Sequence, residues 1–111
     1  MSGNMNDVLR QATRMRKDME RVSEELKDVY VEASAGGDLV EVVVNGQQEL
    51  AKLSLDPKLF APGSDGQPDV EMIEDLIIAA ISQGMEKSKA LMKTEMDKAT
   101  GGLSGSLPGL F

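Results

Sequence analysis

The sequence predicts an α+β fold in which two long helices enclose a three-stranded antiparallel meander, in the order α-β-β-β-α. Apolar residues recur at helical spacing over the first 28 residues and again over 70–99, whereas residues 29–55 alternate with the period of a strand. The length of 111 residues fits one domain. We expect that domain to span 1–100 and a flexible Gly/Leu/Pro tail to span 101–111.

The first helix, expected over residues 4–28, carries a narrow apolar stripe. Its members are spaced alternately by three and four residues, which is the heptad pattern of a coiled-coil seam. They are Met5, Val8, Ala12, Met15, Met19, Val22, Leu26 and Val29. A narrow stripe of this length favours another helix as its partner, and packing on the chain's own sheet is the alternative.

Residues 29–34, 39–44 and 48–55 are expected to form the three strands. Gly36-Gly37-Asp38 predicts the first turn between them. Asn45-Gly46 predicts a two-residue type I′ hairpin, in which both central residues have positive φ.

The second helix is expected over residues 69–99, after a Pro/Gly/Ser-rich linker at 61–68. Asp69 is a suitable N-cap because its carboxylate can accept a free backbone N–H group. The N-terminal half has a broad apolar arc that should lie on the sheet, formed by Val70, Ile73, Leu76, Ile77, Ala80 and Ile81. Gly84 follows this arc and indicates either a close helix contact or a bend.

The net charge of −7 conceals an uneven distribution of charge. Residues 1–21 and residues 87–111 each carry a net charge of +2, whereas residues 22–86 carry −11. Four cations form one row along the first helix: Arg10, Arg14, Lys17 and Arg21. Arg16 lies beside this row, and Asp18 and Glu20 lie off it. Cationic ends held away from an anionic body are suited to binding a polyanion.

The helix lengths predict how these ends are placed. Helices over 4–28 and 69–99 are roughly 37 and 45 Å long, whereas strands of this kind span only about 20 Å. Both helices must therefore extend beyond the sheet. We expect the two cationic ends to pack antiparallel as an arm projecting from the body. Uncovered sheet edges and the broad apolar arc predict a homodimer with two such arms.

The composition argues against an enzyme. The chain has no His and no Cys, so a serine nucleophile lacks its usual base, and thiol chemistry and imidazole ligands are absent. We therefore expect no cofactor, no metal site and no small-molecule substrate. No apolar run approaches the roughly 20 residues of a membrane span, and the N-terminus does not resemble a signal sequence. A cytoplasmic location is expected.

An adaptor or chaperone-like protein is the main alternative. Eight Met residues, three of them in the stripe of the first helix, suit an adaptable apolar groove for another protein. Such binding should tolerate salt, whereas phosphate binding should weaken steeply as salt rises.

The sequence resembles the YbaB/EbfC family of bacterial nucleoid-associated proteins over nearly its whole length. The resemblance is carried in order by the heptad-bearing first helix, residues 37–46 (GDLVEVVVNG), residues 53–57 (LSLDP), residues 72–80 (MIEDLIIAA) and residues 107–109 (LPG).

This resemblance implies a nucleoid-associated homodimer whose paired terminal helices bind duplex DNA like the jaws of tweezers. Binding would rely mostly on phosphate contacts with low sequence specificity, and could influence nucleoid organisation and gene expression. By position, the DNA-contacting residues would be Arg10, Arg14, Arg16, Lys17, Arg21, Lys87, Lys89 and Lys93.

Overall fold

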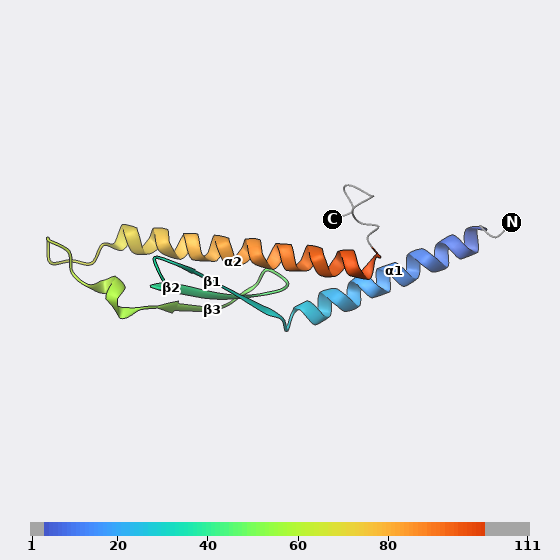
Figure 1. The fold of residues 1–111 in the computed structure, drawn as a ribbon, viewed down its shortest axis with the longest axis horizontal. Coiled ribbons are helices and arrows are strands. Elements are labelled where there is room, and N and C mark those ends of the chain that lie inside the picture. Colours follow the sequence, from blue (N-terminus) through green and yellow to red (C-terminus); the bar gives the residue numbers. More distant parts are fainter. Residues whose placement is uncertain (1–3, 102–111) are drawn as a thin grey trace.

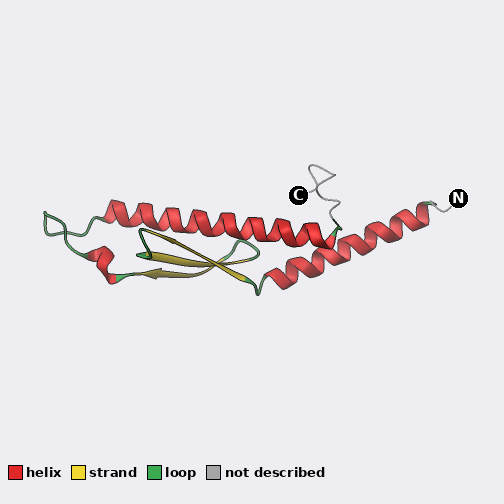
Figure 2. Cartoon of the chain, viewed as in Figure 1, coloured by secondary structure: helices red, strands yellow, loops and turns green. Residues whose placement is uncertain are grey.

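The computed structural model describes residues 4–101 and confirms the α-β-β-β-α order (Figures 1 and 2). The elements are α1 (Met5–Leu26), β1 (Tyr30–Ala35), β2 (Val40–Asn45), β3 (Leu50–Leu55), the 3-10 helix η1 (Pro57–Phe60) and α2 (Val70–Ala99). The predicted bounds of helices and strands differ from these by at most two residues. Only η1, in which Asp56 accepts a hydrogen bond from the backbone of Lys58, was not predicted. Apart from Gly101, the predicted tail lies outside the described residues.

The molecule is elongated, as the helix lengths predict. Its principal extents are 79 × 24 × 16 Å and its radius of gyration is 20.7 Å, compared with about 13 Å for a compact domain of this size. In Figure 1, α2 runs along the sheet and continues past it, while α1 leaves the end of the sheet and extends beyond the C-terminus of α2.

The sheet has the order β1-β2-β3, with both pairs antiparallel. Helix α2 lies over β1 and β2, and the main core forms between them. Its centre is the alternating set Val40, Val42 and Val44 on β2, which is almost fully buried. Asp69 caps α2 as predicted, because its carboxylate accepts the backbone N–H of Met72 at 3.0 Å.

Of the two roles considered for Gly84, the close contact is the one observed. A β-carbon at this position would lie 2.8 Å from Cγ2 of Val44 and 3.1 Å from Cγ2 of Val42. Only glycine lets the backbone of α2 approach the valines of β2 at this distance.

The predicted two-residue turn at Asn45-Gly46 is wrong. Asn45 ends β2, and the residue with positive φ in this turn is Gln48, at 60°. The side chain of Asn45 sets the longer path because its Oδ1 accepts the backbone N–H groups of Gln47 (2.9 Å) and Glu49 (3.0 Å). Gly46 is required for space, since a β-carbon there would lie 2.7 Å from the carbonyl oxygen of Leu26.

A second, smaller core joins the two helices beyond the sheet. Val22 and Leu26 of α1 pack there with Met96 of α2, and the half-buried Met19, Leu91, Met92 and Ala99 surround them. A helix is therefore the partner of the C-terminal part of the heptad stripe, as predicted. The stripe does not stay buried along its whole length, because Met5, Val8 and Val29 are exposed.

Candidate nucleic-acid interface

The N-terminal part of α1 stands apart from the rest of the molecule. We call residues 5–17 the arm tip. The helix starts at Asn4, whose side chain accepts the backbone N–H of Asp7 at 2.9 Å. Helix α2 ends at Ala99, followed by Gly101 with a φ of 63°. Because α2 ends there, the exposed fractions of Met5, Val8 and Leu9 reach 70%, 55% and 57%.

The arm tip carries the clearest candidates for binding an anion. Arg10, Arg14 and Lys17, which we call the tip cations, are exposed and line one side of the tip with Asn6, Leu9 and Thr13. None of the three forms an ion pair with any residue in the range 4–101. Their charge is therefore available to a ligand in solvent.

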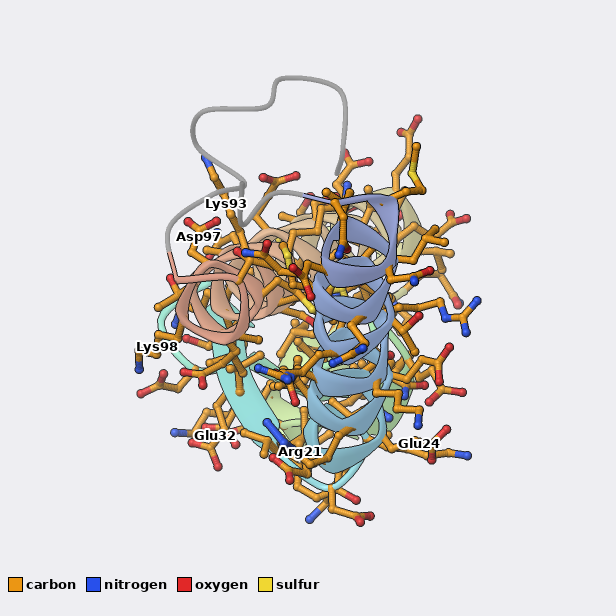
Figure 3. The ribbon with its side chains drawn as sticks, turned by 90° about the vertical axis from the view of Figure 1, so that its right-hand side faces the viewer. Arg21, Glu24, Glu32, Lys93, Asp97 and Lys98 are labelled. Atoms are coloured by element: carbon orange, nitrogen blue, oxygen red, sulfur yellow. The ribbon has the colours of Figure 1, made fainter. Side chains whose placement is uncertain are left out.

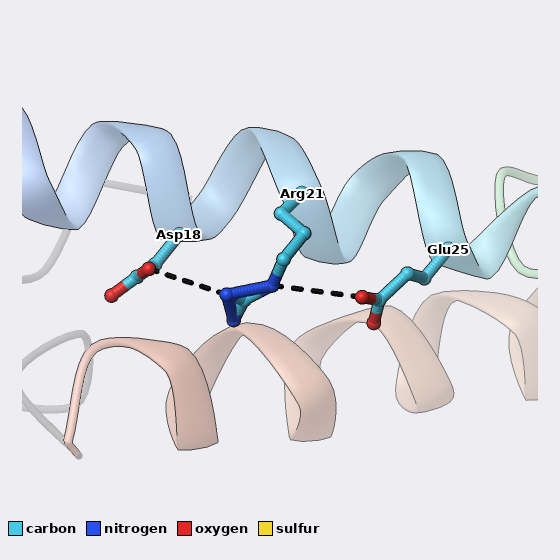
Figure 4. Close-up of polar contacts among 3 residues, drawn as sticks. All are labelled: Asp18, Arg21 and Glu25. Atoms are coloured by element: carbon cyan, nitrogen blue, oxygen red, sulfur yellow. Dashed lines mark hydrogen bonds and ion pairs between the residues drawn. The ribbon is translucent and has the colours of Figure 1, made fainter.

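The other two predicted cations of α1 are paired within their own helix. Arg21 lies between Asp18 (3.4 Å) and Glu25 (3.6 Å), as Figure 4 shows, and Arg16 lies 3.9 Å from Glu20. Carboxylates that lie off the cationic row therefore still offset the charge of Arg21 within the row and of Arg16 beside it. Residues three or four apart share one side of a helix, so a long side chain can reach a carboxylate beside its row.

The predicted lysines of α2 lie apart from the arm tip. The Lys87 ammonium donates to the carbonyl oxygen of Glu32 on β1 at 2.7 Å, and Lys89 lies 3.8 Å from Glu86. In Figure 3, Lys93 and Asp97 lie near each other on α2. The C-terminal half of α2 packs on the C-terminal half of α1. The two terminal helices thus pack against each other beyond the sheet, as predicted. Helix α1 then continues alone past the end of α2, so the tip cations lie beyond the lysines of α2 and are not paired with them along one arm.

The turn between β2 and β3 fixes the base of the arm, a role that the sequence did not indicate. The amide of Gln47 donates to the carbonyl oxygen of Ser23 at 2.7 Å, and the amide of Asn45 donates to that of Lys27 at 3.2 Å. The backbone N–H of Gly46 lies 2.9 Å from the carbonyl oxygen of Leu26. These bonds supply donors to carbonyl groups at the end of α1, where intrahelical donors run out. The carbonyl oxygen of Leu26 also accepts the backbone N–H of Val29 at 3.1 Å.

The same turn is also bound to α2. The hydroxyl of the fully buried Ser88 donates to the carbonyl oxygen of Asn45 at 2.6 Å, and it accepts from the backbone and the side chain of Gln48. One turn therefore holds the end of α1 and the middle of α2 in a fixed relation.

An apolar surface remains open beside α2. Leu50, Leu53 and Leu55 pair with Val44, Val42 and Val40, so they share the face that α2 covers, but α2 lies over the other two strands. Their exposed fractions are 42%, 41% and 37%. We call these residues the β3 leucines. Ile78 of α2 is 63% exposed. It precedes Lys87 by nine residues, or about two and a half helical turns, so the two residues lie on opposite sides of α2. Because Lys87 contacts β1, Ile78 lies on the side of α2 away from β1.

The described part of the chain shows no group of acidic residues arranged to hold a metal ion. No helix within residues 4–101 is long and apolar enough to span a membrane.

An elongated α+β fold with a cationic helical tip on an anionic body is suited to binding a polyanion. Comparison with known proteins identifies the family of proteins to which the chain belongs. The YbaB/EbfC DNA-binding family matches residues 1–103, and the chain belongs to this family. The family is described as DNA-binding, which agrees with the expectation that the protein is not an enzyme.

A nucleoid-associated protein of Acetivibrio thermocellus is 45% identical over 109 residues, which cover 98% of this chain and 91% of that protein. Another nucleoid-associated protein, from Pelotomaculum thermopropionicum, is 39% identical over 111 residues, covering 100% and 99% of the two chains. The crystal structure of an uncharacterized protein from Helicobacter pylori has a TM-score of 0.60 at 26% identity, covering 72% of this chain and 87% of the other.

Proposed function

We propose that this protein is nucleoid-associated and binds duplex DNA through phosphate contacts made by the tip cations. The observation that carries the proposal is the placement of Arg10, Arg14 and Lys17 on a helix that projects from the body and offers them no acidic partner among residues 4–101. The body carries most of the chain's negative charge, so DNA is repelled there and attracted at the tip.

Contacts of this kind position a duplex without reading its bases. The tip cations are arginine and lysine side chains that can bind phosphate oxygens. Within residues 4–101, no second residue holds any of them in the orientation that base recognition needs. Low sequence specificity follows. With three cations on each of two arms, about six phosphates are neutralised, and the slope of log K against log salt approaches about −5.

The β3 leucines support the homodimer that this mechanism uses. A second copy can cover them with the same surface, because a two-fold interface is self-complementary. Ile78 adds apolar area at the margin of this surface. The resulting dimer presents two arm tips, and a duplex bound by both gains affinity from their linkage.

The decisive experiment measures fluorescence anisotropy of a labelled random duplex at two salt concentrations. Arg14→Glu/Lys17→Glu should abolish binding. The matched control is Lys52→Glu/Lys58→Glu, which changes the net charge equally but at exposed positions on the body. If the two variants lose affinity equally, net charge rather than the arm tip controls binding and the proposal fails.

The dimer is tested separately by sedimentation equilibrium. Leu53→Glu places a charge among the β3 leucines and should yield monomers. Lys52→Glu alters the neighbouring position on the opposite face of the strand and should leave the dimer intact. A monomeric wild-type protein would contradict this part of the proposal.

A second candidate function, a salt-tolerant adaptor for another protein, is favoured only by the exposed Met5, Val8 and Leu9. Strong binding to DNA that falls steeply with salt would exclude it as the main function.

A further inference from the structure

The arm tip has a second face that DNA binding does not use. We call Met5, Val8 and Ala12 the tip stripe. Each of these residues is followed nine positions later by a cation, which is Arg14, Lys17 and Arg21, respectively. Nine residues make about two and a half helical turns, so each pair lies on opposite sides of α1. A duplex bound to the tip cations therefore leaves the tip stripe uncovered.

The tip stripe continues an interface that already exists in the fold. Its heptad spacing leads through Met15 and Met19 to Val22 and Leu26, which pack against α2. Met15 and Met19 are half-buried, whereas the three residues of the tip stripe are exposed because α2 has ended. The stripe thus retains the pattern of a helix-packing seam but lacks a helix.

We propose that the tip stripe pairs with the tip stripe of a second copy, so that two joined arms bridge two DNA duplexes. The proposal rests on the proposed function, since each arm must first hold a duplex. Another arm tip has a seam of the same length and spacing. A duplex does not suit this face, because its outer surface is lined with phosphates and offers Met5 and Val8 no apolar partner.

The placement of charge explains why pairing leads to bridging. The tip cations face away from the tip stripe, so pairing the stripes does not bring the cations together. It directs the two sets of cations outward on opposite sides of the joined arms. Each side then presents a separate cationic surface, and one duplex can lie along each.

The size of the stripe indicates that this contact depends on DNA. The arm tip is roughly 18 Å long, and it holds fewer than the three to four heptads of a sustained coiled coil. Pairing should therefore be weak between free molecules. Bound to neighbouring duplexes, the arms are held at high effective concentration, and the same contact becomes populated.

The test compares bridging with single-duplex binding. Bridging is measured by capturing a fluorescent duplex on beads that carry a second duplex, and single-duplex binding by anisotropy. The variant Met5→Gln/Val8→Gln removes most of the apolar stripe without changing charge, and its positions are solvent-exposed. The control Val70→Gln/Met72→Gln makes the same two kinds of replacement at exposed positions in the first turn of α2, at the end of the molecule away from the arm tip.

We expect Met5→Gln/Val8→Gln to bind a single duplex within twofold of wild type but to need at least tenfold more protein for bridging, while the control behaves as wild type in both assays. Equal bridging by the variant would overturn the inference, because the two arms of one dimer would then suffice. Failure of wild type to bridge despite binding single duplexes would also overturn it. Absence of single-duplex binding would instead reject the proposed function, and this inference with it.

A second readout locates the contact. The chain has no Cys, so Ala12→Cys introduces a unique thiol within the tip stripe. A short bismaleimide should cross-link this variant between copies when DNA is present and much less without it. Thr13→Cys, on the neighbouring side of the tip, should react severalfold less. Equal cross-linking of the two variants would contradict pairing through the stripe.

Discussion

Replacing Ser88 by alanine tests whether the β2–β3 turn holds α2 as the structure indicates. The hydroxyl makes three hydrogen bonds, to the carbonyl oxygen of Asn45 (2.6 Å), the backbone N–H of Gln48 (3.1 Å) and the amide of Gln48 (2.9 Å). Ser88 is fully buried, so water cannot replace the hydroxyl without rearrangement. The variant removes all three bonds and leaves the surrounding shape nearly unchanged.

The expected cost follows from which groups keep another partner. The backbone N–H of Gln48 also donates to the carbonyl oxygen of Asn45 at 3.2 Å, and its amide also donates to that of Gly46 at 3.0 Å. The loss therefore amounts to about two ordinary hydrogen bonds, or about 2 kcal/mol. Alanine returns about 0.5 kcal/mol through its higher helix propensity. We expect Ser88→Ala to lower the free energy of unfolding by about 1.5 kcal/mol.

Urea unfolding followed by circular dichroism measures this difference, at one fixed protein concentration because self-association adds to apparent stability. Ser82→Ala is the matched control, since Ser82 is exposed on the same helix and should gain slightly from the substitution. If Ser88→Ala and Ser82→Ala have the same stability, the buried network does not contribute as reasoned here.

Three further outcomes are expected. Gly46→Ala should lower the free energy of unfolding by about 2 kcal/mol, because the added β-carbon would lie 2.7 Å from the carbonyl oxygen of Leu26. The control in the same urea titration is Gly63→Ala, whose β-carbon would lie 3.6 Å from its nearest neighbour. Arg14→Gln should weaken duplex binding and reduce the salt slope by about two for the proposed dimer, because one phosphate contact is lost on each arm. Arg21→Gln should have a smaller effect because Asp18 and Glu25 already offset its charge. Equal losses in anisotropy titrations would refute this ranking. Asp69→Ala should cost about 1 kcal/mol through loss of the α2 cap, and an unchanged urea midpoint would show that the cap is dispensable.

The elements of this fold could be predicted because local patterns determine them. The heptad spacing of α1, the β-branched run of β2 and the capping residue Asp69 each act over a few residues, and all three agree with the structure. The excess helix length over strand length was enough to predict that α1 projects from the body. Gly84 was correctly predicted to be required either for a close helix contact or for a bend. Only the position of Val44 in the structure showed that the close contact is the reason.

The candidate site was less predictable because it depends on side-chain reach and on where one helix stops beside another. Arg21 belongs to the same row as Arg14, yet two carboxylates reach Arg21, and none from the described part of the chain reaches Arg14. Lys87 has the charge of a DNA-contacting residue but is held against β1. Gly46 suggested a turn through backbone conformation, whereas its actual constraint is the carbonyl oxygen of Leu26, twenty residues earlier.

Because α1 is attached to the β2–β3 turn at its C-terminal end, a small rotation at this end produces a large displacement of the arm tip. The distance along the helix from Leu26 to Met5 is about 32 Å. At that distance a rotation of about 10° at the base displaces the tip by more than 5 Å, close to the spacing of successive phosphates on one strand. Substitutions around the buried Gly46 and Ser88 can therefore shift the position of the arm tip while the tip cations themselves stay the same.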